Sequence, residues 1–156
     1  MRLRILLPAL ALVAALALPT ATSAHQSRSH EHGQRGSQQI LGTWSVTVTP
    51  DGQPSFQALV TLEAGGGVTE TESDQPGTGL GAWEQVGRNT YRFAFETFLF
   101  TATGAPGGHV IVRGLTSLKD GTLSGPFKFD VYDPSGNVVQ SGSGTSTGTR
   151  FQIPDF

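Results

Sequence analysis

Apolar and polar residues alternate with a period of two through most of the chain from residue 40 onward. Within the segment 41–50, Trp44, Val46 and Val48 occupy every second position from 44 to 48, and the segment 56–62 repeats the pattern. Such alternation is typical of β-strands with one buried face. Runs rich in glycine, asparagine, aspartate and proline separate the segments, and Lys119-Asp120-Gly121 indicates a tight hairpin. The sequence therefore predicts an all-β domain of eight strands.

Consecutive hairpins leave two open sheet edges, and closing the sheet on itself removes both. We therefore predict that residues 40–156 form a single domain, an eight-stranded antiparallel up-and-down β-barrel. A two-sheet β-sandwich built from the same strands is the alternative. The chain has no cysteine, so strand pairing and packing must stabilise the fold without disulfides.

The most aromatic segment, "TYRFAFETFLF", changes its phase along its length. Phe93 and Phe95 share one face, whereas Phe98 and Phe100 fall on the other. One extra residue in a strand re-aims the side chains that follow it. We therefore expect a β-bulge near Thr97.

Residues 1–24 have the character of a secretory signal peptide. Arg2 and Arg4 precede an apolar run, and small residues follow it. The run is shorter than the roughly 20 residues that span a bilayer, so we expect no membrane span after cleavage. The sequence thus predicts a secreted protein.

Residues 25–39 contain no aliphatic or aromatic side chain to bury, which predicts a disordered leader. His25, His30 and His32 lie in this leader. Imidazoles this close in sequence can bind a transition metal, but without a preformed geometry a solvated tail is the simpler interpretation.

The charge balance excludes one class of partner. Loss of residues 1–24 removes two arginines, so 10 basic residues against 12 acidic ones become 8 against 12, and the net charge moves from −2 to −4. An acidic chain without basic clusters lacks the electrostatic footprint of nucleic-acid binding. We expect no nucleic-acid partner, and the oligomeric state stays open.

Two short motifs at opposite ends of the domain point to a family. Gly42-Thr43-Trp44 begins the first predicted strand, and Gly148-Thr149-Arg150 ends the last. These motifs resemble the structural signature of the lipocalin and calycin barrels. The resemblance implies that Gly42 and Trp44 lie at the closed end of a barrel, where Arg150 packs across the indole. It also implies that a small hydrophobic ligand binds inside.

Apolar side chains at period two supply candidates for the inner face and so for ligand binding. They are Val60, Leu62, Phe93, Phe95, Ile111, Leu115, Phe127 and Phe129. An eight-stranded barrel is wide enough either to be filled by such side chains or to hold one small ligand. A packed, ligand-free module that acts through its surface therefore remains an alternative to a binding barrel.

A barrel enzyme, of an isomerase or cyclase type acting on an apolar substrate, is the third alternative. Glu70 and Glu72 share one face of their strand, and a buried carboxyl with a raised pKa can act as a general acid. Glutamates exposed on the outer face of a strand are equally common, so these two acids need not be buried. His109, beside a glycine turn, is likewise more typical of a surface residue than of a catalytic base. We find no nucleophile elbow, phosphate loop or metal-ligand spacing in residues 40–156, and so predict no catalytic residue, metal or cofactor.

Overall fold

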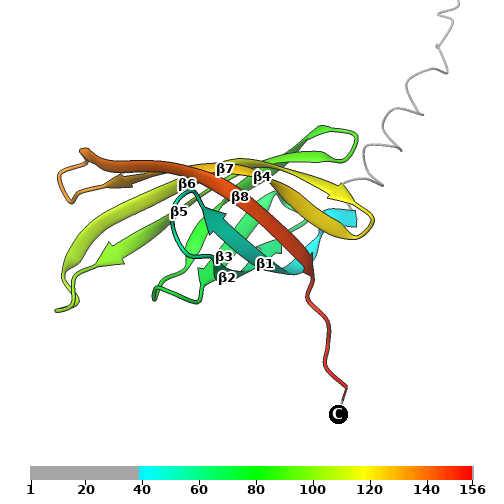
Figure 1. Ribbon diagram of the computed structural model, residues 1–156, viewed down its shortest axis with the longest axis horizontal. Helices are drawn as coiled ribbons and strands as arrows, with labels where there is room; N and C mark the ends of the chain where they lie inside the picture. The colour runs from blue at the N-terminus through cyan, green and yellow to red at the C-terminus, as the bar shows by residue number, and fades with distance from the viewer. Residues whose placement is uncertain (1–38, 156) are drawn as a thin grey trace, which may run out of the picture.

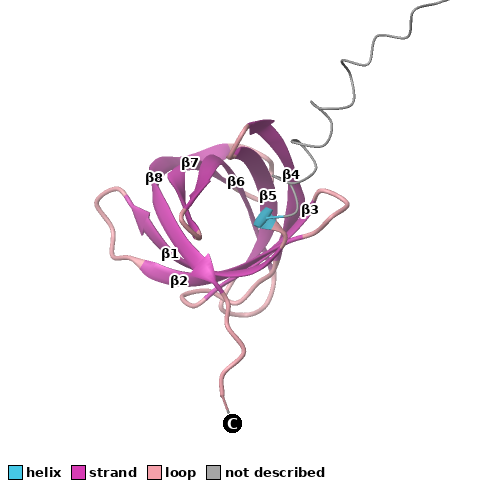
Figure 2. Ribbon diagram, turned by 90° about the vertical axis from the view of Figure 1, so that its right-hand side faces the viewer, coloured by secondary structure: helices cyan, strands magenta, loops and turns pink. Residues whose placement is uncertain are grey.

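Eight antiparallel strands pair in sequence order and close into a barrel in the computed structural model, which describes residues 39–155 (Figure 1). The strands are β1 (Gly42–Pro50), β2 (Phe56–Leu62), β3 (Gly67–Glu72), β4 (Gly79–Gly87), β5 (Thr90–Phe100), β6 (Pro106–Lys119), β7 (Thr122–Tyr132) and β8 (Val138–Arg150). Figure 2 looks along the barrel and shows β8 lying beside β1, which closes the sheet. The predicted barrel is confirmed, and the sandwich alternative is wrong.

The N-terminal predictions concern residues outside the described part of the chain. The predicted signal peptide, residues 1–24, lies there, as does the predicted leader 25–39 apart from Gln39. Metal binding by His25, His30 and His32 therefore stays a prediction. Among the residues that are described, no helix has the length and apolar character that a membrane span requires.

The hairpin between β6 and β7 forms where the turn residues predict it. Asp120 and Gly121 both have positive φ angles, of 50° and 78°. A two-residue turn with two positive φ angles is the type that matches the twist of antiparallel strands. Lys119 pairs with Thr122 across this turn, so the turn sets the register of the two strands.

The change of phase in β5 has a different cause from the one predicted. The strand continues through Thr97 without a register shift, and the shift lies between Leu99 and Phe100. Thr97 is therefore buried, while the side chains of Phe98 and Phe100 lie on the outer face, 64% and 60% exposed. The expected bulge near Thr97 is wrong, because the segment simply has aromatic residues on both faces.

Trp44 closes one end of the barrel, which we call the closed end. Its side chain is 1% exposed, and its indole Nε1 donates a hydrogen bond of 2.8 Å to the carbonyl oxygen of Ile40. Ile40 is fully buried beneath the barrel wall, and Tyr91 is buried to the same degree as Trp44. Burial of these large side chains at one end makes the interior a blind chamber.

Arg150 ties the last strand to the first. Its guanidinium carbon lies 4.3 Å from the centroid of the Trp44 ring, and the two residues are direct partners in the β1–β8 register. The same guanidinium donates hydrogen bonds to the carbonyl oxygens of Leu41 and, at 2.5 Å, of Gln39. The predicted contact between Trp44 and Arg150 is therefore present.

The backbone conformation and the position of Arg150 explain why residue 42, two positions before Trp44, is a glycine. Gly42 has a φ of 110°, a backbone conformation that residues with a side chain rarely adopt. A Cβ atom at this position would also lie 2.6 Å from Nη1 of Arg150. A glycine is thus needed for the guanidinium to reach across the start of β1.

We expect Trp44 and Arg150 to stabilise the barrel as a coupled pair. Trp44→Ala should lower the free energy of unfolding by about 3–5 kcal/mol, because it leaves a large cavity at the closed end. A double-mutant cycle with Arg150→Ala should give a coupling of about 0.5–2 kcal/mol, the range of a cation–π contact. Urea denaturation of the four proteins measures both quantities. Additive effects would show that the contact contributes no stability.

Candidate functional site

The interior of the barrel is hollow. A cavity of about 370 Å³, which we call the lumen, is lined by residues of all eight strands. Aromatic rings line it without filling it, because they lie against glycines on the neighbouring strand. A Cβ atom on Gly144 would lie 2.7 Å from Cζ of Phe127, and one on Gly142 would clash with the ring of Phe129. These glycines let the rings lie along the wall, and the centre stays open.

The open end of the lumen lies opposite Trp44. The strand registers place Pro50, Phe56 and Leu99 at the opposite end of the barrel from Gly42 and Leu62. The four strands β5 to β8 have 11 to 14 residues, whereas β2 and β3 have seven and six. The long strands continue as two hairpins past this end, so the mouth has one tall wall (Figure 1).

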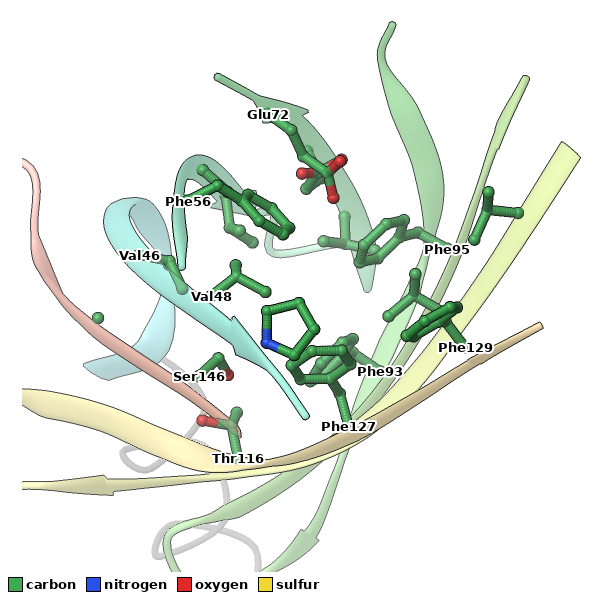
Figure 3. Close-up of a pocket in the computed structure, with 18 of the residues that line it drawn as sticks. Val46, Val48, Phe56, Glu72, Phe93, Phe95, Thr116, Phe127, Phe129 and Ser146 are labelled. Carbon is green, nitrogen blue, oxygen red and sulfur yellow. The ribbon is translucent and has the colours of Figure 1, made fainter. Parts of the chain in front are cut away.

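Six of the eight predicted ligand-binding residues line the lumen. They are Val60, Leu62, Phe93, Phe95, Phe127 and Phe129. Figure 3 shows these four phenylalanines and Phe56 around the pocket, with Val46 and Val48 of β1 also in its wall. The rings of Phe93 and Phe95 stack with their centroids 6.2 Å apart. The lining is therefore mainly apolar and aromatic.

The prediction that Ile111 and Leu115 face the interior is wrong. In β6 the lumen is lined by Val110, Val112 and Thr116, so the odd-numbered residues point outward, and Leu115 is 45% exposed. The segment has apolar residues in both phases, and period two alone does not tell which face is inner. The inward position 114 is a glycine, so it adds no apolar residue to the inner phase of the pattern. The ring of Phe93 occupies the space that a side chain at this position would take.

Glu70 and Glu72 both line the lumen, and we call them the carboxyl pair. Glu70 is 3% exposed, and its Oε1 atom has no hydrogen-bond partner. Glu72 lies nearer the mouth, where Gln75 Nε2 donates a hydrogen bond of 2.5 Å to its Oε2. Figure 3 shows the Glu72 carboxyl directed into the pocket from the side of Phe56 and Phe95. Two acids thus face an apolar chamber.

Burial changes the protonation of this pair. Loss of solvent contact, together with the charges of Glu72 and Asp74, raises the pKa of Glu70 from 4.5 to about 8. Burial also raises the pKa of Glu72, although the hydrogen bond from Gln75 partly opposes the effect. At neutral pH Glu70 therefore keeps its proton inside the lumen.

Glu84, Glu96 and His109 are not part of the lining of the lumen. The exposed side chain of Glu84 forms an ion pair with Arg92 on the outer face. His109 stacks on Tyr132, with centroids 4.6 Å apart, and its Nε2 lies 3.9 Å from Oε1 of Glu96. Within residues 39–155, no three His, Cys, Asp or Glu side chains gather closely enough to hold a metal ion.

Several lining residues were missed by the sequence reasoning, which considered only long apolar side chains and acids. The additional polar members of the lining are Gln53, Asp74, Gln75, Tyr91, Thr116, Gln140 and Ser146. Most of them lie in loops or in strands rich in glycine, serine and threonine, where alternation carries little signal. The small inward residues of β8 were the one available sign that the barrel is hollow rather than filled.

We expect the carboxyl pair to make the barrel less stable as pH rises. Between pH 4.5 and about 8 the folded chain keeps a proton on Glu70 that the unfolded chain has released. The free energy of unfolding should therefore fall over this range, by at most about 1.4 kcal/mol per pH unit, and level off above it. Urea denaturation between pH 4 and 9 measures the slope.

The matched variants are Glu70→Gln and, as a control, Glu63→Gln, since Glu63 is exposed. Glu70→Gln should flatten most of the slope and exceed the wild type in stability above pH 8, whereas Glu63→Gln should keep the wild-type profile. A wild-type slope that survives Glu70→Gln would mean that another group titrates.

Comparison with known proteins places the fold but no family. No protein-family model matches the chain, and no curated protein matches it. Among solved structures, the barrel is similar to EF1p2_mFAP2b bound to DFHBI, with a TM-score of 0.59 and 17% identity over 76% of this chain and 99% of that one. A redesigned β-barrel gives a TM-score of 0.47 and 23% identity over 76% of this chain and 96% of that one. The first likeness supports the small β-barrel fold.

Proposed function

We propose that this barrel binds a small, mainly apolar molecule in its lumen. The observation that carries the proposal is a cavity of about 370 Å³ lined by five phenylalanines, with the fully buried Ile40 lining the end where Trp44 lies. Cavities of roughly 300–1,000 Å³ with apolar walls and a few polar groups are typical of small-molecule sites. The similar barrel EF1p2_mFAP2b was solved with DFHBI bound, so the shared fold is compatible with such a function.

We also propose that the barrel is related to the lipocalins and that the protein is exported. The contact of Arg150 with the Trp44 indole supports the first proposal, because the resemblance of the two motifs implies this pairing. The composition of residues 1–24 supports the second. Both proposals agree with a carrier of apolar molecules.

Filling part of the lumen should weaken ligand binding. Ser146 lines the cavity on β8, whereas its neighbour Thr147 is exposed on the outer face. Ser146→Leu should weaken the binding of N-phenyl-1-naphthylamine, a small apolar dye, by about tenfold or more, since the added side chain takes ligand space. Thr147→Leu places a leucine on the outer face instead and should leave the dissociation constant within about twofold. Fluorescence titration measures both.

The variants must first be shown to fold, by circular dichroism and by urea denaturation. Unchanged dye affinity in a folded Ser146→Leu protein would place the dye outside the lumen. Absence of saturable, one-to-one binding to the wild type would favour the packed, ligand-free module.

A second candidate function is acid–base catalysis inside the lumen, and one observation favours it. A carboxyl with a pKa near 8 can give up a proton at neutral pH, and the neighbouring Glu72 can accept one. Such a pair suits the isomerisation or cyclisation of an apolar substrate. The apolar walls would then shape the substrate around the carboxyl pair.

Comparison of bound molecules separates a carrier from an enzyme. Wild-type and Glu70→Gln proteins are purified from the same host, extracted with organic solvent, and the extracts resolved by chromatography and mass spectrometry. If the barrel is a catalyst, the extract of the wild-type protein should contain a different isomer from the extract of the Glu70→Gln protein. The same molecule in both extracts would argue against catalysis by Glu70.

A further inference from the structure

We propose that the preferred occupant of the lumen is an apolar molecule that carries a protonated amine, with the nitrogen held at the carboxyl groups of Glu70 and Glu72. This inference rests on the proposed function, since it requires that the lumen bind a ligand. It adds a chemical class that the apolar walls alone do not define. Two observations carry it: the sign of the charges in the lining and the unpartnered oxygen of Glu70.

The charged groups of the lining are all acidic. Glu70, Glu72 and Asp74 line the cavity, and no lysine, arginine or histidine of the described residues does so. The Arg150 guanidinium lies at the closed end, over the Trp44 ring and outside the lining. An apolar chamber strengthens the field of such charges. It therefore attracts a cation and repels an anion such as a fatty-acid carboxylate.

The Oε1 atom of Glu70 lacks a hydrogen-bond partner although it is buried. Its side chain is 3% exposed, and Oε1 accepts no hydrogen bond from the protein. Buried polar atoms are nearly always hydrogen-bonded, so an unpartnered one in a cavity wall marks a position for a donor. An ammonium group offers three donors and a positive charge, which suits two neighbouring carboxyls.

Aromatic walls meet the carboxyl pair at the same point. A Cβ atom on Gly79 would lie 2.7 Å from Cδ2 of Phe95 and 3.0 Å from Oε2 of Glu70, so ring and carboxyl converge where this glycine leaves room. Figure 3 shows Phe56 and Phe95 on either side of Glu72. A cation between carboxyls and aromatic faces gains from both. A neutral apolar ligand gains only from the rings.

The acids also mark a way in. Asp74 follows the end of β3, Glu72 pairs with Ala58 near the mouth, and Glu70 pairs with Val60 one step deeper. These three residues lead from the mouth toward the middle of the lumen. The apolar end of the ligand would then lie deeper still, against Trp83 and Val68, which line the inner part.

Three probes with one ring system test the inference: 1-naphthylmethylamine, 1-naphthylmethanol and 1-naphthoate, a cation, a neutral donor and an anion at pH 7. Isothermal titration with the full chain measures each affinity. We expect the amine to bind about tenfold more tightly than the alcohol, as one additional close charge pair predicts, and the naphthoate to bind most weakly. Ser146→Leu should weaken the amine and the alcohol alike.

The matched variants separate charge from shape. Glu70→Gln with Glu72→Gln should bring the affinities for the amine and the alcohol to within about threefold of each other, because the charge is lost while the volumes are nearly unchanged. Glu63→Gln, on an exposed side chain, should keep the preference. An amine preference that survives in the double variant would overturn the inference, because the nitrogen would then lie elsewhere.

The pH dependence gives an independent signature. Glu70, Glu72, Asp74 and Tyr91 are the titratable groups of the lining, and burial raises the pKa of Tyr91, which keeps it neutral. Below pH 8 an ammonium must displace the proton of Glu70, so its binding should release a proton and tighten as pH rises from 6 to 8. The alcohol should do neither. Titration in two buffers of different ionisation enthalpy measures the proton count.

The outcomes distinguish this inference from the function on which it rests. Equal affinities for amine and alcohol, both lost in Ser146→Leu, would leave the binding function standing and overturn the amine. Failure of all three probes and of N-phenyl-1-naphthylamine to bind the wild type would overturn both.

Discussion

The pairing of the first strand with the last is the constraint on which the whole structure depends. Between Trp44↔Arg150 and Pro50↔Gly144 every residue of β1 has a partner in β8, and this ladder removes the two edges that a meander would leave. The Arg150 guanidinium fastens the ladder at one end, since it covers the indole and binds two carbonyls of the entering chain. Closure at that end turns a ring of strands into a chamber with one mouth.

Whether such a chamber is filled or hollow depends on the balance of large and small inward residues. Phenylalanines project inward from β5 and β7, and on their own they would fill a barrel of this size. The inward positions of β8 are small, from Gly142 and Gly144 to Ser146 and Gly148. Because the rings lie against these positions, volume remains at the centre. The glycine content of β8 is thus a property of the cavity as much as of the strand.

The sequence predicts the strands, the barrel and the Trp44–Arg150 contact, because period two, turn chemistry and two end motifs act locally. It does not predict which face is inner where both faces are apolar, and the errors at Ile111 and Leu115 have this cause. The sequence also does not predict whether the carboxyl pair faces inward or outward, for a related reason. In β3 threonines alternate with acids, and the structure directs the acids inward and leaves Thr71 exposed, opposite to what polarity alone favours.

An acid in that position is costly to the fold, and nothing in the described residues offsets the cost by ion pairing. Each unit by which burial raises a carboxyl pKa corresponds to about 1.4 kcal/mol of differential stability. A valine at position 70 would face Val60 and Phe95 without this cost. The unpartnered Oε1 of Glu70 therefore has no structural explanation. A ligand with a hydrogen-bond donor, of the kind proposed above, would account for both the burial of this carboxyl and the missing partner of its Oε1 atom.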